Sequence, residues 1–92
     1  MTVKFVVALL MVLGFASAAE ANGPAADACA AKLTPDGKAI YAATVAARPT
    51  KDNLRSVVEH QTRSLAWDGK IGRGDARDNA KAAGECVKLG WE

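Results

Sequence analysis

Residues 67–77, WDGKIGRGDAR, bring three glycines, two aspartates and three cations together in one short stretch. A glycine-rich loop can bind phosphate, aspartates can hold calcium, and the tripeptide at 73–75 matches an adhesion ligand. The stretch lacks the Walker spacing, however, and no hydrophobic strand precedes it. A calcium loop starting at Asp68 would place Lys70 and Gly72 where oxygen ligands belong. We therefore interpret the stretch as a connection between two helices, and the adhesion tripeptide as a chance match in the first turn of the second.

A second candidate for chemistry is His60, which lies four residues from Ser56 and from Ser64. On a helix this spacing puts an imidazole between two hydroxyls on one face. Nucleophilic catalysis also needs an orienting carboxylate and an oxyanion site, and no recognisable motif supplies them. We interpret these residues as a solvated helix face and predict that the protein is not an enzyme.

The two cysteines, Cys29 and Cys86, are 57 positions apart, near the two ends of the chain that would remain after export. In an oxidising compartment they predict an intramolecular disulfide. Closing a loop of that size stabilises a fold by about 4 kcal/mol on the chain-entropy model. One alternative is an acylated lipoprotein cysteine at Cys29, although residues 26–28 (ADA) lack the expected aliphatic residue. A zinc site with His60 is another, but no cluster of ligands accompanies it, and we predict no metal and no cofactor.

The N-terminal segment, residues 1–19, has the features of a secretory signal peptide: one lysine, an apolar run from Phe5 to Leu13, and small residues at its end. Cleavage is expected after Ala18, Ala19 or Ala21. The run is too short and too interrupted to span a bilayer, so we expect no stable membrane insertion after its removal. The predicted location is the periplasm or the exterior.

Residues 20–92 are then expected to form a single small helical domain. They hold eleven Lys and Arg against ten Asp and Glu, for a net charge of +1, and sixteen alanines. This charge balance, with no basic run interleaved with aromatics, predicts no nucleic-acid partner. A core of so few large apolar residues benefits from a covalent staple.

Two helices are expected in the first half of this domain. Pro24 favours the first turn of a helix over 24–33. Thr34 before Pro35 is typical of a helix cap, which predicts a second helix over 35–47, ended by the Arg48-Pro49 pair.

Two more helices are expected in the second half. Apolar residues from Leu54 to Leu65 recur on one face, which predicts a helix over 51–66 capped by Thr50 or Asp52. Gly69 can end it in the left-handed conformation. Gly72 is expected to start the last helix, which stops at Gly90. No alternating strand pattern follows the signal segment, so we predict an all-α bundle of three to four short helices stapled by one disulfide.

Three large amphipathic residues, Tyr41, Trp67 and Trp91, are candidates for contact with a partner. In so small a protein such residues are more often core anchors. Trp91 follows Gly90 at the C-terminus, where it either folds back on the bundle or stands exposed.

Two segments carry a resemblance to known proteins: CAAKLTPDGKAIY at 29–41 and TRSLAWDGKIGRGDARDNAKAAGECVKLG at 62–90. They resemble short exported proteobacterial proteins of unassigned function with one cysteine near each end of the mature chain. The resemblance implies export and cysteine pairing, and no site residue.

A looser similarity in size, export and a single disulfide links the chain to small helical periplasmic acid-stress chaperones of the HdeA type. Two functions follow as hypotheses. We favour a non-catalytic exported binding or accessory module with an unknown protein partner, and the alternative is a stress-related chaperone of the periplasm.

Overall fold

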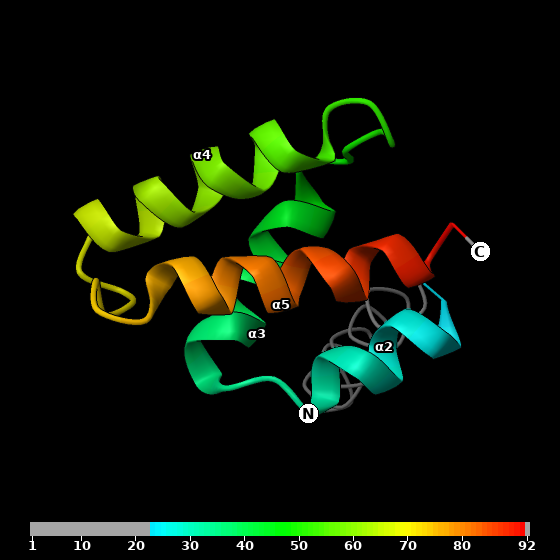
Figure 1. Cartoon of the computed structure of the whole chain (residues 1–92), viewed down its shortest axis with the longest axis horizontal. Helices are drawn as coiled ribbons and strands as arrows, with labels where there is room; N and C mark the ends of the chain where they lie inside the picture. Colours follow the sequence, from blue (N-terminus) through cyan, green and yellow to red (C-terminus); the bar gives the residue numbers. More distant parts are fainter. Residues whose placement is uncertain (1–22, 92) are drawn as a thin grey trace, which may run out of the picture.

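The computed structural model describes residues 23–91, which form four helices and, within that range, no strand (Figure 1). They are α2 (Pro24–Ala31), α3 (Pro35–Ala46), α4 (Leu54–Trp67) and α5 (Ala76–Leu89). The predicted all-α fold of short helices is therefore confirmed. The predicted signal peptide and its cleavage positions lie outside the described residues.

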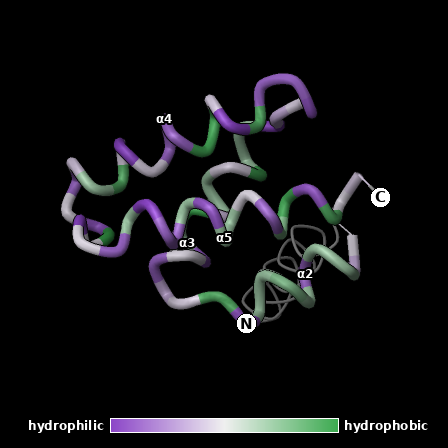
Figure 2. The backbone as a smooth tube through the Cα atoms, in the orientation of Figure 1, coloured by the Kyte–Doolittle hydropathy of each residue, from purple (hydrophilic) through white to green (hydrophobic). Residues whose placement is uncertain are grey.

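Helix α5 lies at the centre of the bundle and contacts each of the other three helices. Helices α4 and α5 run side by side in opposite directions, while α3 crosses behind α5 and α2 packs beside its C-terminal part (Figure 1). Each helix contributes buried residues to the interior, and hydrophobic segments, green in Figure 2, occur along the tube of the helices. The buried hydrophobic residues form one cluster: Ala26, Ala30, Ile40, Tyr41, Leu54, Val58, Ile71, Ala83, Cys86 and Val87. The four helices therefore share one small core.

The predicted disulfide is present between Cys29 of α2 and Cys86 of α5, with their Cα atoms 5.4 Å apart. Helix α2 has only eight residues, and an isolated helix of that length is unstable in water. The bridge therefore holds the shortest helix against the central one.

The first connection shows why α2 ends at Ala31, two residues before the predicted end. The hydroxyl of Thr34 accepts a hydrogen bond of 3.0 Å from the Gly37 amide and caps α3, as expected. This cap requires an extended Thr34 backbone, with φ −62° and ψ 162°. The chain therefore has to leave the α2 helix beforehand.

The second connection shows why α4 begins at Leu54 rather than at residue 51. Arg48, which precedes Pro49, adopts a left-handed backbone with φ 52° and ends α3 as expected. Thr50 and Asn53 then form a reciprocal pair: the Asn53 amide donates to the Thr50 hydroxyl at 3.3 Å, and the Thr50 amide donates to the Asn53 side chain at 2.7 Å. This closed turn precedes the regular helix.

The third connection, within residues 67–77, is confirmed as a helix connection. Gly69 has φ 72°, and the amides of Gly69 and Lys70 donate back to the carbonyls of Ala66 and Leu65 at 3.1 and 2.9 Å. These two bonds make a Schellman ending for α4. Ile71 then enters the core.

The expected start of the last helix at Gly72 is wrong, because α5 begins at Ala76. The Gly72 amide donates to the Asp36 carboxylate at 3.0 Å, which ties the connection to the start of α3. The chain needs three more residues to turn into the helix. The tripeptide at 73–75 therefore lies in an exposed turn before α5 rather than in its first turn.

Candidate functional site

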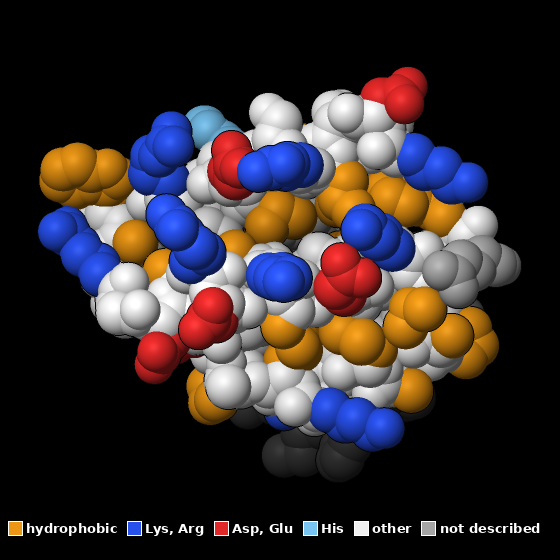
Figure 3. Space-filling view, in the orientation of Figure 1, with side chains coloured by type: hydrophobic (Ala, Val, Ile, Leu, Met, Phe, Trp, Pro, Cys, Tyr) orange, Lys and Arg blue, Asp and Glu red, His pale blue; other side chains and the backbone are white. Residues whose placement is uncertain are grey.

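A groove of about 1110 Å³ runs between α4 and α5. We call it the basic groove. Its floor consists of small or apolar residues: Leu54, Val58, Thr62, Ala66, Ala76 and Ala80. Its rims consist of charged residues: Lys51, Arg55, Glu59, Arg63, Arg73, Arg77, Lys81, Glu85 and Lys88. Figure 3 looks onto this face, where blue side chains border a band of orange and white.

The geometry of the two helices produces this arrangement directly. Residues four apart lie above one another on a helix. On α4 the floor positions recur from Leu54 every four residues, and the rim positions recur in the same way from Arg55, with Lys51 in the turn just before the helix. On α5 floor and rim follow the same spacing from Ala76 and Arg77. Two antiparallel helices with their floor rows turned inward therefore leave charged rows on both edges.

The groove is hollow because the α5 part of its floor is built from small side chains. Ala76 and Ala80 offer only methyl groups, and Gly84 lies further along the same helix face. A Cβ atom built on Gly84 would lie 3.7 Å from the Val58 side chain of α4, so the two helices meet closely there. Gly84 therefore permits a close approach of α4 and α5.

The basic residues of the protein gather on this groove. Seven of the eleven Lys and Arg in the described part of the chain line it, against two of the eight acids there. Both acids pair along their own helices: Glu59 with Arg55 at 3.3 Å and Glu85 with Lys88 at 3.2 Å. Five rim cations form no salt bridge with any described residue: Lys51, Arg63, Arg73, Arg77 and Lys81. The groove therefore carries a net positive charge in a protein that is close to neutral.

Trp67 stands at the end of the groove where α4 meets the connection to α5. It is 74% exposed and is the only large hydrophobic residue exposed among the residues described. The Arg73 guanidinium lies 5.5 Å from the centroid of its ring, within cation–π range. Trp67 is therefore not the core anchor that is the commoner role for such residues, and it remains a candidate for contact with a partner.

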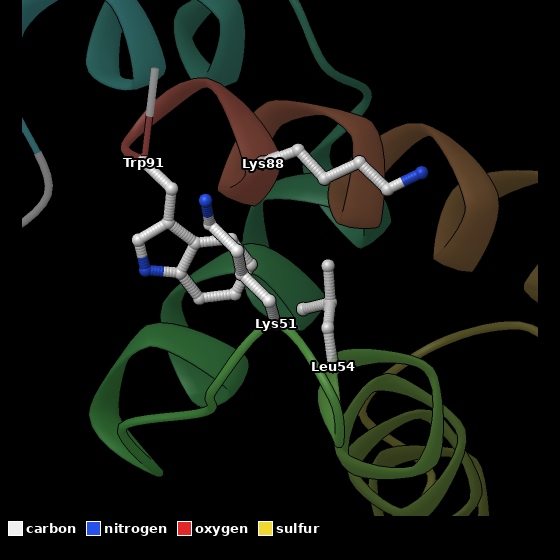
Figure 4. Close-up of a pocket in the computed structure, with 4 residues that line it drawn as sticks. All are labelled: Lys51, Leu54, Lys88 and Trp91. Atoms are coloured by element: carbon white, nitrogen blue, oxygen red, sulfur yellow. The ribbon is translucent and has the colours of Figure 1, made fainter.

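Trp91 stands at the opposite end, where α5 finishes. It is half-buried and packs against the core. It lines a hollow of about 280 Å³ together with Lys51, Leu54 and Lys88, which also line the basic groove (Figure 4). Lys51 and Leu54 lie at the N-terminal end of α4, and Lys88 and Trp91 lie at the C-terminal end of α5. A tryptophan therefore lies at each end of the groove.

Tyr41, the third aromatic candidate, is placed differently. It is a core residue of α3, only 9% exposed, and its hydroxyl donates to the Asp27 carboxylate at 3.4 Å. It does not line the basic groove. The structure therefore makes Tyr41 a packing residue, because it faces α2 and the core rather than the α4–α5 surface.

The remaining chemical candidates do not converge on a site. Ser56, His60 and Ser64 are exposed along α4, as expected for a solvated face, and His60 makes no hydrogen bond with any described residue. Between residues 23 and 91, no three His, Cys, Asp or Glu side chains come together as metal ligands do. No helix in the same range has the length and apolar character needed to cross a membrane.

The basic groove was not predicted from the sequence. Average charge and contiguous basic runs do not reveal cations that recur every four residues on two separate helices. The available signal was the spacing of Lys51, Arg55 and Arg63 and the spacing of Arg73, Arg77 and Lys81. The two rows of cations line one groove only because α4 and α5 pack antiparallel. Neither row by itself indicates that the two helices pack in this way.

Comparisons of the chain with protein-family models, with curated proteins and with solved structures found no match.

Proposed function

We propose that this protein is a non-catalytic binding module that works outside the cytoplasm, and that the basic groove is its binding surface. The observation that carries the proposal is the gathering of seven of the eleven Lys and Arg residues described around one floor of small or apolar residues. Exposed concave surfaces that combine apolar floor with unpaired charge are typical of interaction sites.

The proposed location is supported by the Cys29–Cys86 bridge, because structural disulfides persist in oxidising compartments. The non-catalytic assignment is supported by the exposure of His60, Ser56 and Ser64, none of which lines the basic groove or the hollow beside Trp91. The structure gives less support to the alternative function, an acid-stress chaperone. It needs carboxylates whose protonation opens the fold, and none of the described carboxylates is buried.

Site-specific photo-crosslinking in the producing cells tests the proposed function. A photoreactive amino acid is placed at Glu85, on the rim of the groove, and in a matched control at His60, an exposed α4 position outside it. We expect a discrete heavier adduct from position 85 and none from position 60. Identical adduct patterns at the two positions, or no adduct at either, contradict the proposal.

A further inference from the structure

The shape and charge of the groove narrow the class of partner, and this step rests on the proposed function. We propose that the basic groove binds an acidic amphipathic α-helix of another protein. In this arrangement the small apolar stripe of the partner helix lies on the groove floor. Its Asp and Glu residues flank the stripe on both sides and face the two rims.

The length and form of the groove match a helix. Helices α4 and α5 each have 14 residues, which corresponds to about 21 Å. A third helix laid between two antiparallel helices buries one apolar face while its own backbone hydrogen bonds stay intact. The alanine floor at positions 66, 76 and 80 lets that helix approach closely. A partner helix of about four turns spans the distance from the Trp67 end to the Trp91 end.

The charge of the groove matches acidic residues on both edges of such a helix. Unpaired cations stand on each rim, with Lys51 and Arg63 on the α4 side and Arg77 and Lys81 on the α5 side. Carboxylates four residues apart on a docked helix recur with the same spacing as Arg77 and Lys81 on α5. Complementary charge speeds association and selects the partner, while the apolar floor contributes the contact area.

Other occupants use only part of this surface. A lipid bilayer is flat on this scale and would rest on the rims, leaving the floor uncovered. A nucleic acid would satisfy the cations, but phosphates gain nothing from an apolar floor, and Trp67 and Trp91 stand only at the ends, so they form no row of stacking rings along the groove. A second copy placed face to face would bring like charges together.

Titration with designed peptides tests this inference. The acidic probe is a fluorescent helical peptide of about 16 residues with a stripe of Leu and Ala and with Glu on both flanks. A second peptide has Lys in place of Glu, and a third has the composition of the first with the stripe dispersed. A DNA duplex and vesicles containing phosphatidylglycerol are the remaining probes. Anisotropy reports binding, and circular dichroism reports helix formation.

The protein variants separate docking from charge attraction. Arg77→Glu with Lys81→Glu reverses the charge of the α5 rim at two exposed positions, and Lys32→Glu with Lys38→Glu is the matched control, equal in charge change but outside the groove. Ala80→Phe fills the floor without changing any charge. Thermal melting confirms that each variant is folded.

We expect the acidic amphipathic peptide to bind and to gain helix, at least about tenfold more tightly than the other two peptides. The rim reversal and Ala80→Phe weaken this binding by about tenfold or more, while the control pair changes it by less than about threefold. Equal weakening by both charge-reversal pairs, or no effect of Ala80→Phe, overturns the inference.

Selective groove binding of the duplex or the vesicles in place of the peptide also overturns it. The proposed function would then stand if position 85 still gives its specific crosslink. If neither selective peptide binding nor the specific crosslink at position 85 is observed, both the proposed function and the proposed helical partner are rejected.

Discussion

The Arg73 guanidinium lies over the ring of Trp67, 5.5 Å from its centroid, and thereby links the last residue of α4 to the connection that enters α5. The contact positions the most exposed aromatic side chain of the described residues at the mouth of a groove rich in unpaired cations. Because the pair is solvent-exposed, its contribution to stability is about 0.5–1 kcal/mol at most. Trp67 does not itself line the groove, but its contact with Arg73, which does, holds the indole beside the end of the groove.

Trp67→Ala and Trp91→Ala are expected to affect different properties. Trp67 is mostly exposed, so its removal should lower the free energy of unfolding by less than about 1 kcal/mol while weakening binding in the groove. Trp91 packs against the core, so its removal should cost about 1–3 kcal/mol. Chemical denaturation and peptide titration of the two variants measure both properties. Equal stability losses would contradict the distinction.

Removal of the disulfide should destabilise the protein more than the loss of either tryptophan. The bridge joins residues 57 positions apart, and its loss in the Cys29→Ala, Cys86→Ala variant should lower the unfolding free energy by about 4 kcal/mol. Calorimetry of the oxidised protein, the reduced protein and the variant checks this value. A reduced protein that melts cooperatively at the same temperature as the oxidised one would show that the bridge does not hold the fold.

Gly69→Ala should destabilise the protein by about 1 kcal/mol, because a Cβ atom disfavours the left-handed backbone at φ 72°. No neighbouring atom lies within 4 Å of the added carbon, so the effect is purely conformational. Gly74→Ala is the matched control, since this glycine also has free space but no positive φ. Urea denaturation should show the control to be neutral or slightly stabilising.

Gly84→Ala should stabilise the protein by about 0.5–1 kcal/mol, because alanine is the better residue in a helix interior. The new methyl group would meet Val58 at 3.7 Å, which is an ordinary van der Waals contact. Ala82→Gly, at an exposed position of the same helix, should have the opposite sign and a similar size. Thermal and urea denaturation of the two variants measure both changes. A loss of stability in Gly84→Ala would show that α4 and α5 cannot accommodate the methyl group.

Local sequence signals predicted most of the secondary structure. Thr34 caps α3, Arg48 before Pro49 ends it, and Gly69 ends α4, each through bonds made within a few residues. The early end of α2 and the late start of α4 have local causes, the Thr34 cap and the Thr50–Asn53 turn, whereas the error at the start of α5 involves a distant residue. The start of α5 was placed at Gly72, but the amide of that residue donates to Asp36 on another helix, and helix periodicity contains no trace of such a bond.

By itself the sequence determined the helical class and the approximate position of each helix, because these follow from short-range backbone preferences. It also determined the disulfide pairing, because two cysteines allow only one intramolecular bond. The tertiary structure alone decided that Tyr41 is buried, that Trp67 is exposed, and that two rows of cations face each other across a hollow. The average charge of a sequence does not show where its charged residues lie in the folded protein. Only the antiparallel packing of α4 and α5 turns two ordinary helix faces into one basic surface.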